Sequence, residues 1–89
     1  MERLKAAAVL CYRSDEDKYP FVYTARRHVD IYEELHELHI KYRYSIEGFV
    51  TNTFRFVDRY EAKKIAVEAA QLIVPLEDTY VALYSEDVW

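Results

Sequence analysis

The chain has 89 residues, of which 52% are hydrophobic, including nine Tyr, four Phe and one Trp, and its formal net charge is −4. This length predicts a single domain over residues 1–89, and the modest negative charge argues against a nucleic-acid-binding protein. Cys11 is the only cysteine, which excludes an intrachain disulfide. The charged first residues and the lack of a long apolar run argue against a signal peptide or a membrane span, so we expect a cytoplasmic protein.

The first half of the chain predicts two strands and a helix. Leu4–Arg13 is almost continuously apolar, as is typical of a central strand. A polar loop over 14–19 leads to a second strand at Phe21–Ala25, and the short connection favours an antiparallel pair. Helical spacing of apolar residues then predicts a helix over about Val29–Ile40, with its core positions at Ile31, Leu35 and Leu38.

The second half predicts a hairpin, a helix and a last strand. Alternation at Tyr42, Tyr44 and Ile46 indicates an extended segment, and Gly48–Val57 forms a tight hairpin around Asn52-Thr53. Asp58 and Glu61 have the spacing of a capping box at the start of a second helix, which ends before Pro75. The helix carries an apolar stripe of mostly small residues: Ala62, Ile65, Ala66, Ala69 and Leu72. Tyr80–Tyr84 alternates as a final strand. The predicted fold is therefore α+β: a small antiparallel sheet in the order β-β-α-β-β-α-β, with two helices packed on it.

Basic residues gather at the starts of both predicted helices. Arg26, Arg27 and His28 precede the first helix, and Arg55 and Arg59 flank the start of the second. Free backbone N–H groups and the helix dipole favour anions at such positions, and Arg adds charge-assisted donors for phosphate or carboxylate. The alternative is that these side chains pair with carboxylates of the chain itself, such as Glu33, Glu34 or Asp58, or with the acidic cluster at 15–17.

Aromatic residues close to these cations could stack a nucleobase. Tyr32, Phe54 and Phe56 occupy such positions in the sequence. Together with Arg26, Arg27, His28, Arg55 and Arg59 they form the predicted binding site for a small, anionic, nucleotide-like ligand.

The sequence supports neither a metal site nor an enzyme. Glu33-x-x-His36 has the spacing of a helical metal motif, but the chain contains no second copy of it, and His36 and His39 do not match the metalloprotease spacing. Nucleophile–base pairs and a Gly-rich phosphate loop are also missing. We therefore expect no metal, no cofactor and no catalytic residues.

Several stretches resemble a family of small phage and prophage proteins. They are Gly48-Phe49-Val50-Thr51, Arg55-Phe56-Val57-Asp58-Arg59, Glu61-Ala62, Ile65-Ala66, Ala69-Ala70-Gln71 and the last seven residues, Leu83 to Trp89. The start, Ala6 to Ala8, and Arg27-His28 also match. The family pattern runs GFVTxxGRFVDRxEAxxIAxxAGQ and closes with LYSEDLW. This chain departs from it at Phe54 and Ala70, where the family has Gly, which changes the backbone freedom close to Arg55 and Arg59.

This resemblance implies an accessory protein that a phage uses in the host cytoplasm against host defence. The leading hypothesis is that it sequesters a small phosphorylated ligand without catalysis. The alternative is an inhibitor that binds a host enzyme or immune sensor directly through its aromatic surface and its acidic C-terminal segment. A third possibility is a nucleotide-cleaving enzyme with His28 as acid or base.

The aromatic content also predicts self-association. A domain of this size buries only about 60% of the surface that its unfolded chain exposes, and a monomer would have to leave part of its Tyr and Phe surface in water. Soluble proteins seldom expose a large contiguous apolar patch. We therefore expect a homodimer or a larger closed ring.

Overall fold

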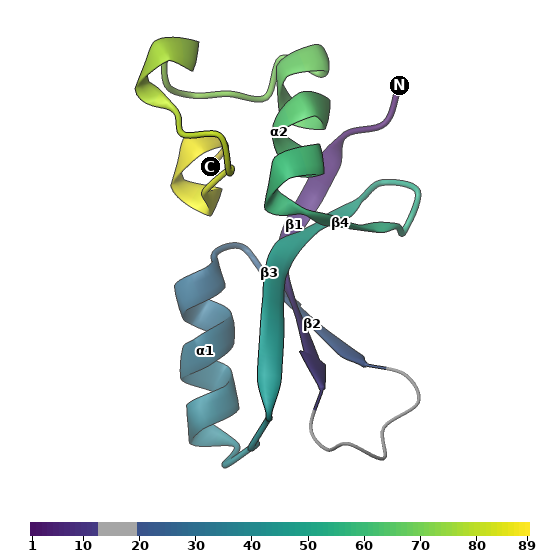
Figure 1. Ribbon diagram of the computed structural model, residues 1–89, viewed down its shortest axis with the longest axis vertical. Helices are drawn as coiled ribbons and strands as arrows, with labels where there is room; N and C mark the ends of the chain where they lie inside the picture. Colours follow the sequence, from purple (N-terminus) through teal and green to yellow (C-terminus); the bar gives the residue numbers. More distant parts are fainter. Residues whose placement is uncertain (13–19) are drawn as a thin grey trace.

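The computed structural model describes residues 1–12 and 20–89, so the predicted loop at 14–19 and its acidic cluster lie outside the described residues. These described residues form four strands and two α-helices, with two short 3-10 turns near the C-terminal end (Figure 1). The elements in chain order are β1 (Leu4–Tyr12), β2 (Phe21–Ala25), α1 (His28–Glu37), β3 (Tyr44–Thr51), β4 (Phe56–Asp58), α2 (Arg59–Glu68), η1 (Leu76–Asp78) and η2 (Ser85–Asp87).

The four strands form one antiparallel sheet in the order β2-β1-β3-β4. Both predicted hairpins are confirmed, because β1 pairs with β2 and β3 pairs with β4. The predicted central strand is also confirmed, since β1 lies between β2 and β3. The α+β class with an antiparallel sheet and two helices therefore agrees with the sequence prediction.

The predicted fifth strand at Tyr80–Tyr84 is wrong. These residues are irregular, with a bend at Val81 and Ala82, and they belong to a C-terminal segment that lies between α1 and α2 (Figure 1). The alternation of apolar side chains in this stretch suggested a sheet, but of the five residues only Leu83 is buried. Its backbone N–H donates to the carbonyl of Arg59 at 3.0 Å, which fixes the segment to the start of α2 instead of to a neighbouring strand.

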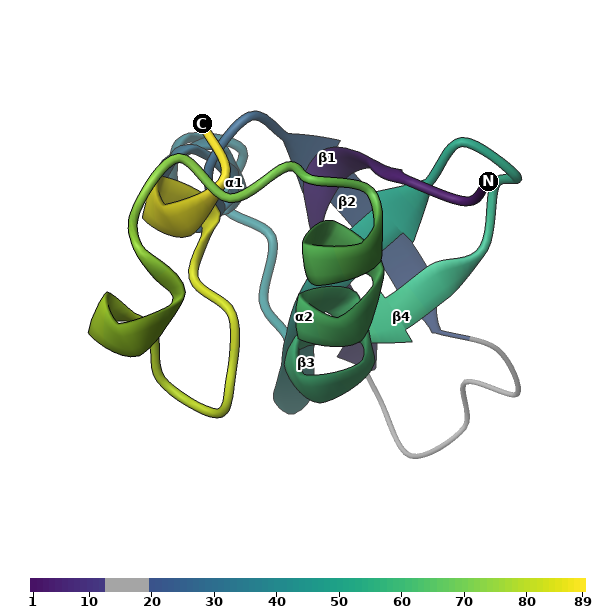
Figure 2. The same cartoon turned by 90° about the horizontal axis from the view of Figure 1, so that it is seen from above.

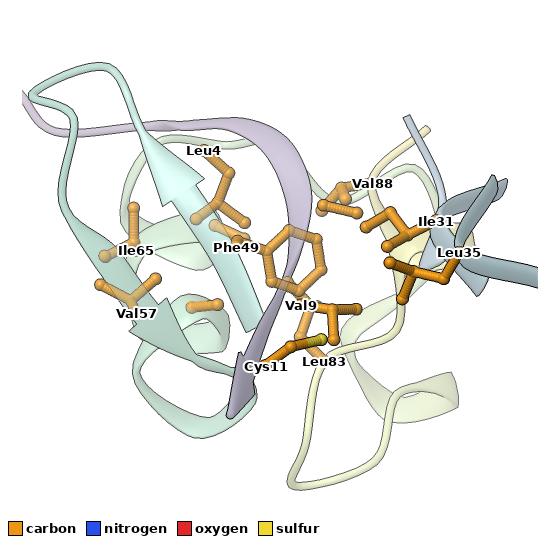
Figure 3. Packing of buried hydrophobic residues seen from close by; sticks show 13 residues of the cluster. Leu4, Val9, Cys11, Ile31, Leu35, Phe49, Val57, Ile65, Leu83 and Val88 are labelled. Carbon is orange, nitrogen blue, oxygen red and sulfur yellow. The ribbon is translucent and has the colours of Figure 1, made fainter. Parts of the chain in front are cut away.

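Phe49 of β3 lies at the centre of the hydrophobic core and has no exposed surface. Figure 3 shows its ring between two groups of side chains. One group comes from α1 and the C-terminal segment: Ile31, Leu35 and Val88. The other comes from the edge strand, β1 and α2: Val57, Leu4 and Ile65. The core is thus continuous from one helix to the other, with Phe49 at its centre and Val9, Cys11 and Leu83 beside it.

Both helices end earlier than the periodicity predicts, and both end in a left-handed residue. His39 follows α1 with φ 56° and Ala70 follows α2 with φ 54°. After each, the next backbone N–H returns to a carbonyl five residues earlier: Ile40 to Leu35 at 2.9 Å, and Gln71 to Ala66 at 2.8 Å. This bond pattern is a Schellman motif, in which Gly is the usual left-handed residue. It ends α1 at Glu37, so Leu38, a predicted core residue, is 58% exposed.

The opposite face of the sheet is covered by no helix of the described chain. The registers place Val22, Leu10 and Ile46 side by side in one row across β2, β1 and β3. The next row along contains Tyr12 and Tyr44, whose rings stack at 4.6 Å between centroids. Further along the same face, the ring of Phe56 lies over Gly48. Within the described residues, one face of the sheet is therefore buried under helices, and the other face is apolar and carries no helix.

Candidate functional site

Arg27 and His28 lie at the start of α1, as predicted, but both side chains are engaged within the protein. Arg27 is the N-cap residue, and its Nη2 donates to the backbone carbonyl of Trp89 at 2.8 Å. The His28 Nε2 lies 2.7 Å from the carbonyl oxygen of Gly48, and its ring meets Phe49 edge-on at 5.2 Å. Both side chains therefore connect the α1 start to β3 and the C-terminal residue.

Arg55 forms the centre of an ion-pair network at the β3–β4 turn. Its Nη2 and Nε contact the Glu2 carboxylate at 2.7 and 3.1 Å, and its Nη1 contacts Glu61 at 2.7 Å. Thr53 Oγ1 also donates to Glu2, at 2.8 Å. These hydrogen bonds, that of Arg55 above all, lower the pKa of Glu2 to about 2 and raise the pKa of Arg55 above its usual value. Two carboxylates therefore neutralise the guanidinium that was predicted to meet an anion.

The capping box at α2 is present only in part. The Asp58 side chain accepts from the Glu61 backbone N–H at 2.8 Å, which confirms Asp58 as the N-cap. The Glu61 carboxylate is bound by Arg55. Sequence spacing identified the cap but could not show this competing partner.

Arg59 lies on the other side of the α2 start, and its contacts are separate from those of Arg55. Its Nη1 contacts Glu47 at 2.7 Å, and its guanidinium lies over the Tyr84 ring, 4.4 Å from the centroid. Its Nε is buried and has no hydrogen-bond partner among the described residues. Arg59 borders a groove of about 510 Å³ together with Tyr32, so the structure brings two predicted site residues together here. Glu47 and Asp58 line the same groove, and their carboxylates oppose an anionic ligand.

The predicted aromatic residues are separated from one another. Phe54 is 79% exposed at the tip of the β3–β4 turn, with Lys5 Nζ 4.9 Å from its ring centroid. Phe56 covers Gly48 on the face of the sheet that carries no helix. Tyr32 lies on the helix side, where its hydroxyl is 3.5 Å from Ser45 Oγ and burial raises its pKa. They therefore offer no common stacking surface for one base.

Arg26 belongs to a shallow hollow that the sequence did not suggest. Lys5, Ala6, Arg26 and Trp89 line this hollow of about 410 Å³. The indole N–H of Trp89 donates to the backbone carbonyl of Arg26, which holds the ring beside the two cations. Within residues 1–12 and 20–89, no carboxylate pairs with Lys5 or Arg26. The predicted site lacked both Lys5 and Trp89. Lys5 is 21 positions from Arg26 and Trp89 is 63 positions from it, and only the folded chain brings them together.

A further hollow lies along the outer side of α2. Tyr60, Lys63, Lys64, Val67, Glu68 and Val81 line this groove of about 630 Å³. Three of these side chains are apolar and well exposed: Tyr60 at 59%, Val67 at 44% and Val81 at 75%. Figure 2 shows the C-terminal segment beside α2, and Val81 of this segment also lines the groove. The sequence contains a pattern that indicates this groove, because Tyr60, Lys64 and Val67 recur at helical spacing on the face of α2 opposite its apolar core stripe.

The described part of the chain contains no cluster of three or more His, Cys, Asp or Glu side chains that could hold a metal ion. In particular, His36 and His39 are exposed at the end of α1 and form no such cluster. Across the same residues, every helix is too short or too polar to span a membrane. Cys11 is fully buried in the core, and burial raises the pKa of its thiol.

Comparison with known proteins gives one match. The family model for the phage T4 y16D protein matches residues 3–89. Neither a curated protein nor a solved structure matches the chain. The match agrees with the expected resemblance to a small phage protein family and extends over almost all of the chain.

Proposed function

We propose that this chain, which belongs to the phage T4 y16D protein family, acts by binding a host protein and catalyses no reaction itself. The observation that supports this proposal is the groove along α2, where Tyr60, Val67 and Val81 expose apolar surface beside one another. Exposed apolar surface that is concentrated at one place marks interaction sites in soluble proteins. Tyr is also among the side chains most favoured as interface anchors.

The walls of this groove are fixed by the core. Leu83, two residues after Val81, is fully buried, and its N–H donates to the carbonyl of Arg59 next to Tyr60. Lys63 Nζ donates to the carbonyl of Tyr80, which joins α2 to the C-terminal segment a second time. A partner therefore meets a surface that is already formed, which reduces the entropy cost of binding.

The charges at the rim indicate the chemistry of the partner. Lys63 and Lys64 contribute two positive charges against the single carboxylate of Glu68. We expect a host segment that places an apolar side chain between Tyr60 and Val67 and a carboxylate next to Lys64. An amphipathic helix or a short extended segment with this pattern fits a groove lined by α2 and by Val81 of the C-terminal segment.

The experiment is affinity capture from host lysate with matched surface variants. Val67→Asp and Val81→Asp introduce a charge into the groove, whereas Val29→Asp introduces the same charge at an exposed apolar site on α1, 55% accessible. We expect the wild type and Val29→Asp to retain the same stoichiometric host protein and both groove variants to lose it, with unchanged thermal unfolding. Retention of that protein by the groove variants, or no retained protein at all, would contradict the proposal.

A second candidate is the sequestration of a small anionic ligand in the hollow of Lys5, Arg26 and Trp89. It is favoured by the two cations without a carboxylate partner in the described residues and by an indole ring held beside them. Of the other predicted cations, Arg55 and Arg59 are paired with carboxylates and Arg27 and His28 meet backbone carbonyls. Within residues 1–12 and 20–89, Arg26 is the predicted cation whose side chain has no such partner.

Calorimetric titration with cyclic and ADP-ribose-type nucleotides tests this candidate. Binding that disappears in Lys5→Gln/Arg26→Gln and persists in Arg55→Gln would support it. No heat of binding at high micromolar nucleotide would exclude it. A small molecule released by heat from protein purified out of infected cells, and detected by mass spectrometry, would also favour it over the host-protein proposal.

A further inference from the structure

The two edges of the sheet differ in how they are protected. The outer strand β4 has three residues, and α2 begins directly after it, so it offers little backbone to another strand. The other outer strand, β2, has five residues. Its register with β1 is regular from Ala7↔Ala25 to Cys11↔Phe21, without a bulge.

The composition of β2 makes this edge unusual. Natural proteins protect a long edge strand with Lys, Pro, an inward charge or a bulge, because its free N–H and C=O groups can pair with another chain. The sequence Phe-Val-Tyr-Thr-Ala has none of these features, and four of its five residue types are among those most favoured in strands. In the described part of the chain, β1 is the only strand that pairs with β2.

We propose that β2 is the interface with a second copy of this chain, which pairs with it antiparallel about a two-fold axis at Tyr23. The product is a dimer with one continuous eight-stranded sheet. Val22 then lies directly opposite Thr24 of the second copy, and Tyr23 lies opposite Tyr23 of the second copy. Each copy uses the same surface, as a closed two-fold interface requires.

A second copy is favoured over another partner by the residues that this pairing brings together. The strand has no charged residue, so no like charges meet although each chain carries a net charge of −4. The pairing also extends the row Val22–Leu10–Ile46. Val22 and Ile46 are 47% and 44% exposed in the single chain, and the row continues into Thr24 and Ala8 of the second copy. Cross-strand neighbours of this kind stabilise sheets.

The expected affinity of the dimer follows from the length of β2. Five residues span about 17 Å and give roughly four to six backbone hydrogen bonds across an antiparallel pair. This is a small interface compared with those of permanent dimers. We therefore expect a reversible dimer whose population rises with concentration in the micromolar range.

The test is sedimentation velocity over a concentration series, with charges placed at the paired positions. The wild type is expected to move from 10.7 kDa towards twice that mass as its concentration rises. Val22→Lys/Thr24→Lys puts like charges opposite each other on both sides of the axis and is expected to stay monomeric. Val22→Lys/Thr24→Glu puts opposite charges at the same places and is expected to dimerise again. Val67→Lys, which adds one positive charge on α2 away from the strand, is expected to dimerise as the wild type does.

If Val22→Lys/Thr24→Glu dimerises, the monomeric state of Val22→Lys/Thr24→Lys is not caused by misfolding. Circular dichroism of both variants checks that they are folded. A wild-type mass that stays near 10.7 kDa up to high micromolar concentration overturns the proposal. So does a dimer that the Lys/Lys pair leaves intact, because that dimer would use another surface.

Discussion

The indole N–H of Trp89 donates to the backbone carbonyl of Arg26, 63 positions earlier in the chain. The carbonyl of Trp89 in turn accepts from Arg27 Nη2 at 2.8 Å, and the indole ring meets Phe49 edge-on at 5.9 Å. The C-terminal residue therefore joins the end of β2, the start of α1 and the centre of the core.

Replacing Trp89 should reveal this link as a loss of stability. We expect Trp89→Ala to lower the free energy of unfolding by about 2 kcal/mol, less than for a fully buried Trp because the ring is half-buried. Urea unfolding measures the change. Tyr80→Ala, at a side chain 71% exposed on the same segment, should change it by less than about 0.5 kcal/mol. Equal effects of the two substitutions would argue against the link.

Replacing Ala70 with Gly should stabilise the folded protein, whereas replacing its neighbour Ala69 with Gly should not. Ala70 has a left-handed φ of 54°, which costs a residue with a Cβ about 1–2 kcal/mol. The greater freedom of Gly in the unfolded chain removes about 0.5–1 kcal/mol of the gain. We expect Ala70→Gly to raise the free energy of unfolding by about 0.5 kcal/mol. Ala69 has an ordinary φ of −86°, so Ala69→Gly should lower it by a similar amount. The same sign for both variants would contradict this interpretation.

Gly48 should tolerate no larger residue. A Cβ at this position would lie 2.1 Å from the Val57 carbonyl oxygen and 2.7 Å from Phe56 Cζ, and the backbone of β4 cannot move away without breaking its pairing with β3. We expect Gly48→Ala to lower the free energy of unfolding by more than about 2 kcal/mol. Ala8→Gly, at its cross-strand neighbour, should cost only about 1 kcal/mol. Both values come from urea unfolding, and a mild effect at Gly48 would show that the strand can shift.

The network of Glu2 and Arg55 predicts a pH dependence of stability. In the folded chain the pKa of Glu2 is lowered from 4.5 to about 2, chiefly by the hydrogen bonds from Arg55. Since the unfolded carboxyl binds its proton first, this contribution is complete above pH 4.5 and disappears as the pH falls towards 2. We expect Glu2→Gln to be less stable than the wild type at pH 6, with the difference shrinking between pH 4.5 and 2.

Urea unfolding midpoints at a series of pH values provide this measurement. Glu33→Gln, which removes an exposed carboxylate on α1, is the control and should follow the wild type throughout. A stability difference between wild type and Glu2→Gln that does not change with pH would mean that the carboxylate acts through shape or packing rather than charge.

Local features of this protein could be predicted from its sequence because each depends on residues within a few positions along the chain. The Asp58 N-cap, the β3–β4 turn and the core positions Ile31 and Leu35 are of this kind. Phe54 and Ala70, where the resemblance led us to expect Gly, both have left-handed φ angles, of 63° and 54°. A Gly at such positions is expected on steric grounds.

The candidate site was decided by tertiary structure. Sequence proximity placed Arg55 and Arg59 together, but they point to different carboxylates, Glu2 and Glu47, which are 53 and 12 positions away. The hollow of Lys5, Arg26 and Trp89 likewise exists only because the strand pairing and the C-terminal segment bring three distant residues together.

The sequence by itself determined the class, an antiparallel sheet with two helices, and the start of α2. It also determined that the chain has a high apolar and aromatic content for a domain of this size. It could not determine the place of residues 80–84, because alternating apolar residues suit a strand and an irregular segment alike until a neighbour supplies hydrogen bonds. Only the folded chain decides this, since the Arg59 carbonyl receives the Leu83 N–H and the core receives its side chain. Charged and polar groups find their partners across the whole molecule, and their pairing is therefore a property of the tertiary structure.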